Sequence, residues 1–133
     1  MKISTRGRYA LRVMVDLAEH SDGNYIPLKD IAERQKISKK YLESIMLDLS
    51  KVGLVDGRHG KGGGYKLNRQ AENYTVIEIL RVTEGDLAPV TCLDCGAAGC
   101  ERAADCRTFE LWAGFYELIK EYFGGKTLAD LIK

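Results

Sequence analysis

Apolar residues recur every three or four positions through most of this 133-residue chain, which is the spacing of amphipathic helices. The pattern predicts a first helix over residues 4–20, then a two-turn helix over 28–35 and a longer one over 39–52. The predicted apolar stripe of the first helix is Ala10, Val13, Met14, Leu17 and Ala18, and that of the third is Leu42, Ile45, Met46 and Leu49. Ser38 is suited to cap the third of these helices, and Gly53 stands where a glycine commonly ends a helix. Two helices joined by a tight turn, the second basic at its start, are typical of a helix-turn-helix.

A β-hairpin is predicted next, because short strand-forming segments at residues 54–55 and 65–67 flank a turn-rich stretch over residues 56–64. Five of the nine residues in that stretch are glycine. The cationic candidates in it are Arg58, His59 and Lys61. This composition is typical of a wing, which places cations against a DNA backbone or in a minor groove. A nucleotide-binding P-loop is the alternative, but it requires Gly-Lys-Ser/Thr at the start of a helix, whereas this stretch returns into a strand.

The second half of the chain predicts further helices. Thr75 and Glu78 form a capping box for a helix over 76–84 that ends at Gly85. After a connector and a cysteine-rich stretch, a long amphipathic helix is predicted over residues 107–123. Two glycines, Gly124 and Gly125, then break the pattern before a short last helix that Thr127 is suited to cap.

The long helix has one broad apolar face. Its members are Phe109, Trp112, Tyr116, Ile119 and Phe123. A face this aromatic is large for one small domain to cover, so the first interpretation is pairing with a second copy of the chain. The alternative is that the face packs on helices of its own chain.

Together these elements predict a mostly α fold with a small β-wing. A winged helix-turn-helix DNA-binding domain is expected over residues 1–85. A connector and cysteine-rich loop would follow over 86–106, and a dimerisation helix with a short C-terminal helix over 107–133.

The net charge of +1 conceals an asymmetry between the two halves. Residues 1–69 hold 14 Lys and Arg against 8 Asp and Glu, a balance of +6, whereas residues 70–133 hold 6 against 11, a balance of −5. This difference favours a polyanionic partner for the first half. The first apolar stretch is interrupted by Arg12 and Asp16 and is too short for a membrane span, so we expect no membrane partner and a cytoplasmic location.

All four cysteines lie within fifteen residues. They are Cys92, Cys95, Cys100 and Cys106. In the cytosol such a cluster more often binds metal or acts in redox chemistry than forms structural disulfides. Thiolates that converge on an iron–sulfur cluster are the first interpretation. Zinc is the second, since Cys92-x-x-Cys95 is a zinc half-motif but the other pair is spaced too widely. Reversibly oxidised thiols are the third.

Several short motifs, spread over nearly the whole chain, match one known family. They are residues 2–10 (KISTRGRYA), 31–33 (IAE), 37–43 (ISKKYLE), Arg58 with 63–67 (GGYKL), 111–112 (LW) and 127–131 (TLADL). On these motifs the chain resembles the dimeric winged-helix regulators that include the iron–sulfur regulator IscR, the nitric-oxide sensor NsrR and the cysteine-metabolism regulator CymR. CymR-like members lack the cysteine cluster, so the resemblance is nearer to the cluster-binding branch.

In that branch three cysteines precede the dimer helix, and Cys92, Cys100 and Cys106 match them. The resemblance implies a cluster, expected as 2Fe-2S with 4Fe-4S as the alternative form. IscR-like proteins often add a His at the position of Phe109, and NsrR-like proteins an Asp at the position of Arg8. Neither is present here, so Cys95 becomes the candidate fourth ligand.

The resemblance also implies that the helix after Ser38 enters the major groove of double-stranded DNA. The candidate DNA-binding residues there are Ser38, Lys39, Lys40, Tyr41 and Glu43. The first four can bond phosphates or base edges at a helix N-terminus, and Glu43 can accept from a cytosine amine or simply be solvated. Arg58 is the candidate for minor-groove insertion, and a homodimer would read a palindromic operator.

Other function classes fit less well. His20 and His59 lie apart with no paired carboxylates, so we do not expect an enzyme. An iron–sulfur electron carrier would have no use for the basic helix-turn-helix and wing. The closer alternative is a CymR-like, zinc-binding or thiol-switch regulator of the same fold without a cluster.

Overall fold

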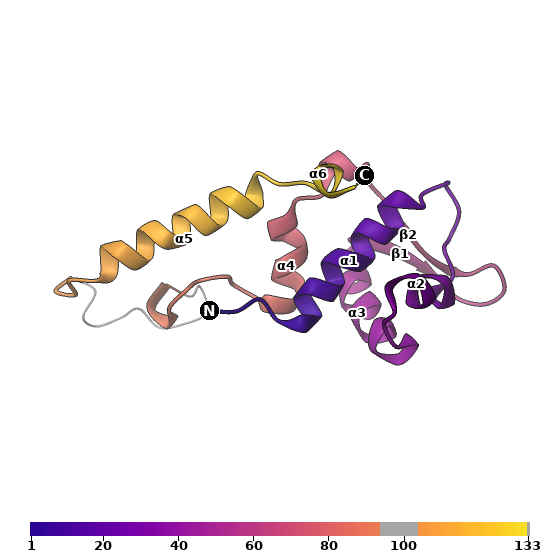
Figure 1. Cartoon of the computed structure of the whole chain (residues 1–133), viewed down its shortest axis with the longest axis horizontal. Helices are drawn as coiled ribbons and strands as arrows, with labels where there is room; N and C mark the ends of the chain where they lie inside the picture. The colour runs from indigo at the N-terminus through magenta and orange to yellow at the C-terminus, as the bar shows by residue number, and fades with distance from the viewer. Residues whose placement is uncertain (94–103, 133) are drawn as a thin grey trace.

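The computed structural model describes residues 1–93 and 104–132. Residues 5–67 form most of a compact head, in which three helices carry a two-stranded antiparallel sheet (Figure 1). Its elements are α1 (Thr5–Glu19), α2 (Leu28–Gln35), α3 (Lys39–Lys51), β1 (Val55–Arg58) and β2 (Gly64–Leu67). The predicted fold class, mostly helical with a small β-wing, is confirmed.

The rest of the described chain adds a short 3-10 turn and a further helix to this head, then extends away from it and returns to it. Its elements are η1 (Ala71–Asn73), α4 (Val76–Glu84), η2 (Thr91–Leu93), α5 (Phe109–Gly124) and α6 (Leu128–Leu131). In Figure 1, α4 lies between α1 and α5, and α5 extends as an arm away from the head. Among the described residues, no helix is long and apolar enough to cross a bilayer.

The core of the head lies where α1, α3 and α4 meet. The inner face of α3 is the predicted one, consisting of Leu42, Ile45, Met46 and Leu49, and all four side chains are fully buried. They pack with the apolar face of α1, which includes Val13, Met14 and Leu17. Helical periodicity therefore identified the buried faces of both helices.

Local polar groups set where the elements begin and turn. The Ser38 side chain accepts a hydrogen bond from the backbone N–H of Tyr41 and so caps α3, as predicted. Between α2 and α3, Lys36 adopts the left-handed conformation with φ 55°, which makes the tight turn of the helix-turn-helix. The capping box of Thr75 and Glu78 at α4 is also present.

The wing is fixed to the head by backbone contacts. Ile26 N–H donates to the Tyr65 carbonyl over 2.8 Å, and Tyr65 N–H donates to the Ile26 carbonyl over 2.9 Å, which adds a bridge beside β2. Gly64 permits this approach, because a Cβ there would overlap the Ile26 carbonyl oxygen and its φ is 145°. The base of the glycine-rich hairpin is therefore anchored.

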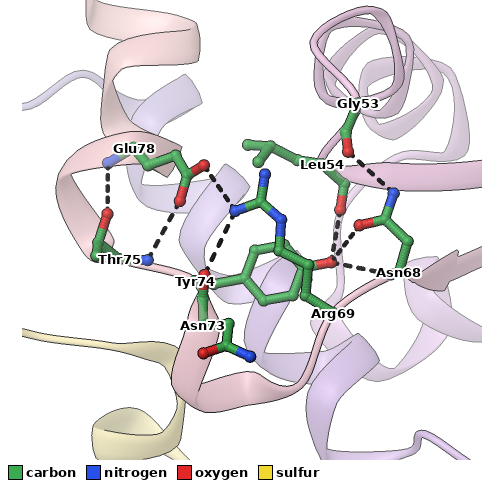
Figure 2. Close-up of polar contacts among 8 residues, drawn as sticks. All are labelled: Gly53, Leu54, Asn68, Arg69, Asn73, Tyr74, Thr75 and Glu78. Atoms are coloured by element: carbon green, nitrogen blue, oxygen red, sulfur yellow. Dashed lines mark hydrogen bonds and ion pairs between the residues drawn. The ribbon is translucent and has the colours of Figure 1, made fainter.

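A polar network joins the base of the wing to α4 (Figure 2). The hydroxyl of buried Tyr74 donates to the Leu54 carbonyl over 2.8 Å and accepts from the backbone N–H of Asn68 over 2.9 Å. Burial raises the pKa of Tyr74, so the hydroxyl keeps its proton. Arg69 lies over the Tyr74 ring and donates to Glu78 over 2.7 Å. The network therefore fixes the segment that connects β2 to α4.

The C-terminal residues pack back on the head. Leu128 is fully buried, and its N–H donates to the Tyr74 carbonyl over 3.0 Å. The predicted cap Thr127 begins α6 with Asp130 in a capping box. The end of the segment over residues 107–133 is thus in contact with the head, whereas α5 extends away from it beside the connector that follows α4 (Figure 1).

Candidate nucleic-acid interface and cysteine segment

A groove of about 480 Å³ separates α3 from the wing. Its lining brings together four of the predicted DNA-binding residues: Lys39, Glu43, Arg58 and His59. The first two come from one flank of α3 and the last two from the end of β1 and the start of the hairpin tip. Side chains nearly twenty residues apart in sequence therefore border one surface feature.

The cations on the wing are positioned by an aromatic side chain. The Arg58 guanidinium lies 5.9 Å from the ring centroid of Tyr25, and the Lys66 ammonium lies 4.7 Å from the same centroid. Both distances are within the range of cation–π attraction. Tyr25 precedes the Ile26 bridge to β2, so the wing's backbone anchor and its charged side chains are held by one short segment.

The other predicted DNA-binding residues lie outside this groove. Lys40 is exposed on the outer face of α3, and Lys61 is exposed at the hairpin tip. The Ser38 hydroxyl is occupied in capping α3. The Tyr41 ring packs edge-on against Tyr9 of α1, with ring centroids 5.8 Å apart. Tyr41 therefore contacts α1 as well as flanking the exposed face.

Sequence reasoning missed two residues in the groove, Leu47 and Lys29. Leu47 follows Glu43 by four residues on α3, and 53% of it is exposed. The sequence did contain a signal for Leu47. It is an apolar residue that lies outside the buried stripe of a helix predicted to read DNA, and a leucine at such a position has no role in the core.

Arg6 contacts α3 on the flank that faces away from the wing groove. Its Nη2 donates to Ser44 Oγ over 2.9 Å and to Asp48 Oδ2 over 2.5 Å, and its guanidinium lies 5.8 Å from the Tyr41 ring centroid. The hydrogen bond to Asp48 raises the pKa of Arg6, which keeps the guanidinium charged. Sequence reasoning had not singled out Arg6, Ser44 or Asp48.

A buried carboxylate holds α2 against α1. Asp16 is 1% exposed, and Arg34 donates to its two oxygens over 3.0 and 2.8 Å. Gln35 adds a third bond of 2.9 Å. Burial opposes ionisation of Asp16, but the bonds from Arg34 and Gln35 outweigh it and lower the pKa. The first helix of the helix-turn-helix is thereby fixed in orientation.

Two of the four cysteines lie among the described residues. Cys92 is half-buried in η2, and Cys106 is exposed three residues before α5. The Cys106 carbonyl accepts from Phe109 N–H over 3.3 Å, and its Sγ lies 3.4 Å from Thr108 Oγ1. Cys95 and Cys100 lie outside the described residues. Within the described part, no three Cys, His, Asp or Glu side chains are grouped as metal ligands.

The chain on either side of the cysteine segment is held together. The Tyr116 hydroxyl of α5 donates to Asp86, six residues before Cys92. Leu87 is buried beside Ile119 in a small apolar cluster. The connector and α5 are therefore packed on each other at these residues. A set of thiols in such a position is chemically suited to an iron–sulfur cluster or to zinc.

The predicted apolar face of α5 is partly covered by the chain itself. Tyr116 and Ile119 are buried, and Ile119 packs with Val76 and Leu80 of α4. Packing within the chain, the alternative to pairing, accounts for these two residues. A dimer role for Phe109, Trp112 and Phe123, which are half-buried, stays a prediction.

A second apolar row on α5 is exposed. It consists of Leu111, Phe115, Leu118 and Tyr122, which are 62, 42, 63 and 63% exposed. Steps of four, three and four residues place the four side chains on one narrow face of the helix. The sequence prediction omitted this row, because the more aromatic face beside it dominated the pattern.

Comparison with known proteins identifies the family. Residues 3–133 match the model of the Rrf2 family, described as an iron-dependent transcriptional regulator. The chain belongs to the Rrf2 family. The predicted resemblance is thereby confirmed, and the chain is similar over its whole length to Rrf2 transcriptional regulators.

Individual Rrf2 proteins of two kinds are similar to it. The HTH-type transcriptional regulator IscR of Xenorhabdus nematophila is 38% identical over 133 residues, which is all of this chain and 80% of that protein. The structure of CymR, the global cysteine regulator of B. subtilis, has a TM-score of 0.79 and 37% identity, covering 98% of this chain and 95% of that one. T. potens IscR has a TM-score of 0.77 and 36% identity, covering 98% and 85%. Overall similarity therefore does not separate the IscR-like from the CymR-like Rrf2 proteins.

Proposed function

We propose that this chain regulates transcription by binding a specific DNA sequence with α3 and the wing. The single observation that carries the proposal is the groove that Lys39 and Glu43 share with Arg58 and His59. A helix flanked by a basic hairpin presents base-reading and backbone-binding side chains at once. The match to Rrf2 transcriptional regulators supports the same conclusion.

In this proposal α3 lies in the major groove. Lys39 and Lys40 would contact phosphates near the N-terminus of α3, where the helix dipole also favours anions. Glu43 would accept a hydrogen bond from a cytosine amine. Arg58, His59 and Lys61 of the wing would contact the adjacent backbone or minor groove.

Selection of binding sites from a random pool of DNA duplexes tests this assignment. Lys40→Ala should weaken binding to all duplexes alike and lower the salt slope by about 1, whereas Glu43→Ala should relax the preference at one base pair. Lys126→Ala, an exposed lysine beyond α5, serves as the matched control and should change neither property. If Lys40→Ala and Glu43→Ala alter binding no more than the control does, the assigned interface is wrong.

We infer that the functional unit is a homodimer that pairs through the exposed row of α5. Four large apolar side chains on one exposed helix face are costly in water, and a second copy of the same face is the simplest cover. Two heads would then read the two halves of a palindromic operator.

Light scattering across protein concentrations tests the dimer. Leu118→Glu should shift the chain to a monomer, because a charge would be buried in the paired face. Leu131→Glu is the matched control, since Leu131 is also exposed but lies on α6. A Leu118→Glu variant that remains dimeric would move the interface elsewhere, with the half-buried Phe109 and Trp112 as the next candidates.

We propose further that Cys92, Cys100 and Cys106 hold an iron–sulfur cluster, with Cys95 as the fourth ligand. The thiol-rich segment and the iron dependence in the family description support this assignment. A bound cluster would supply an iron-containing, redox-active group at the segment between the connector and α5. The residues of this chain would couple it to DNA binding by holding the segment's flanks on α4 and α5, through Asp86, Leu87 and Tyr116.

Similarity to CymR supports the alternative, a regulator of the same fold without a cluster. Iron, acid-labile sulfide and zinc measured per chain on anaerobically prepared protein separate the two. Matching iron and sulfide, lost in Cys100→Ala and Cys106→Ala, is the expected result. Zinc alone, or no metal with full operator binding, would favour a zinc site or thiol switch. Equal operator affinity with and without the cluster would reject coupling.

A further inference from the structure

We propose that Arg6 contacts a DNA backbone phosphate in the complex and that, in the free protein, the Asp48 carboxylate occupies the position of that phosphate. Binding of DNA would then replace Asp48 by the phosphate as the partner of Arg6. The inference rests on the proposed DNA-binding function and adds to it a contact on the flank of α3 that lies away from the wing.

The geometry isolates Arg6 on that flank. Within residues 1–93 and 104–132, the polar and aromatic partners of Arg6 are on α3, at Tyr41, Ser44 and Asp48. Steps of three and four residues place these partners along one line of the helix. The line is neither the buried face of α3 nor the side that borders the wing groove, which contains Lys39 and Glu43. Arg6 therefore borders the exposed face of α3 from the side of α1.

A helix in the major groove has a phosphate backbone on each side of it. The wing supplies cations for one backbone through Arg58, His59 and Lys61. For the other, α1 presents Arg6 beside the helix, and a guanidinium is the side chain best matched to bidentate phosphate contact. An α1 residue in this position fits the way in which the first helix of such folds crosses the backbone.

The Arg6–Asp48 pair is open to exchange. The two side chains are 27% and 37% exposed, so the pair is accessible to an incoming anion and is only weakly stabilised in water. The Asp48 carboxylate accepts a hydrogen bond from Arg6 Nη2, as a phosphate oxygen would. Asp48 therefore neutralises one cation until a phosphate replaces it, and it limits binding to duplexes of any sequence.

Asp48→Asn tests the exchange, because it removes the charge with almost no change in shape. Binding would be measured by fluorescence anisotropy on two labelled duplexes, one of scrambled sequence and one selected by the wild-type chain, over a range of salt concentrations. Asp48→Asn should bind both duplexes roughly three- to tenfold more tightly at low salt, with the log–log salt slope steeper by about 0.9. Glu72→Gln, an exposed carboxylate on η1, makes the same change in net charge and should leave the slope unchanged.

Arg6 variants show whether the gain passes through the guanidinium. Arg6→Gln should bind no more tightly than wild type, and Arg6→Gln/Asp48→Asn should match Arg6→Gln rather than Asp48→Asn. An unchanged salt slope in Asp48→Asn, or a gain that persists without Arg6, would overturn the inference. Asp48→Ser provides a second test of the same charge, and thermal unfolding checks that each variant is folded. Failure of the wild-type chain to bind either duplex would instead reject the proposed function.

Discussion

The head and the α5 arm differ in how far their apolar side chains are buried within the chain. In the head, the apolar faces of α1 and α3 are enclosed within one chain, and the buried carboxylate of Asp16 has three hydrogen bonds. In the arm, one face of α5 packs on α4, while the row from Leu111 to Tyr122 is exposed. The apolar faces of α1 and α3 are thus covered within the chain, whereas the arm leaves an apolar row exposed, which the proposed dimer would cover.

This difference separates two sources of stability. Enclosed side chains stabilise the fold at any concentration, because their burial occurs within one molecule. Side chains that a second copy covers stabilise only the assembled state, so their contribution rises with protein concentration. The same substitution in the two regions should therefore give different kinds of result.

The largest expected difference is between two leucines. Leu49→Ala empties a fully buried position and should lower the free energy of unfolding by about 2–5 kcal/mol at every concentration. Leu118→Ala should have little effect on the isolated chain but weaken its self-association. Urea unfolding at two protein concentrations distinguishes these outcomes. A concentration-independent loss in Leu118→Ala would mean that the row contributes within the chain.

The buried carboxylate of the head should make stability depend on pH. Because the folded-state pKa of Asp16 lies below its ordinary value of 3.8, the ionised form stabilises the fold above that value, and the contribution is lost as pH falls through the folded-state pKa. Asp16→Asn should lower stability by roughly 1.5–3 kcal/mol near neutral pH and flatten the acid limb. Thermal unfolding between neutral and acidic pH measures both effects. An unchanged acid limb in Asp16→Asn would assign the pH dependence to other carboxylates.

Two tyrosines give the next comparison. Tyr74→Phe leaves the Leu54 carbonyl and Asn68 N–H without their buried partner and should cost about 1–3 kcal/mol. Tyr122→Phe, on an arm residue that is 63% exposed, should be nearly neutral for the single chain. Chemical unfolding of both variants tests the pair. Equal costs would show that the network in Figure 2 is no stronger than a surface contact.

The smallest effects are expected from the partly exposed ion pairs of both regions. Arg69–Glu78 in the head and Lys120–Glu117 in the arm both span 2.7 Å, and all four side chains are at least one-third exposed. Lys120→Met and Arg69→Met should each change stability by less than about 1 kcal/mol, because water screens such pairs. A large loss in Arg69→Met alone would assign its role to packing over the Tyr74 ring.

Much of the fold follows from the sequence because its signals are local. The capping groups Ser38 and Thr75 are in the predicted positions, and the inner face of α3 is the predicted stripe. Caps act between residues three apart, and helical periodicity is a property of one segment, so neither requires knowledge of distant neighbours. The cysteine cluster and the basic wing stretch were visible for the same reason.

The candidate interface could be predicted only in part. Lys39, Glu43, Arg58 and His59 were identified singly, but only packing of the wing on α3 places them along one groove. Arg6 and Asp48 are 42 residues apart, and no sequence spacing links them before α1 is packed beside α3.

By itself the sequence determined the helices, the wing, the caps and the position of the thiols, since each depends on residues close together in the chain. The tertiary structure alone decided which face of α5 is covered and which is exposed. Periodicity indicates that a face is apolar, but the surface that covers it comes from elsewhere in the chain. For α5 that surface is α4 and the connector, which bury Tyr116 and Ile119 and leave Leu111, Phe115, Leu118 and Tyr122 in water.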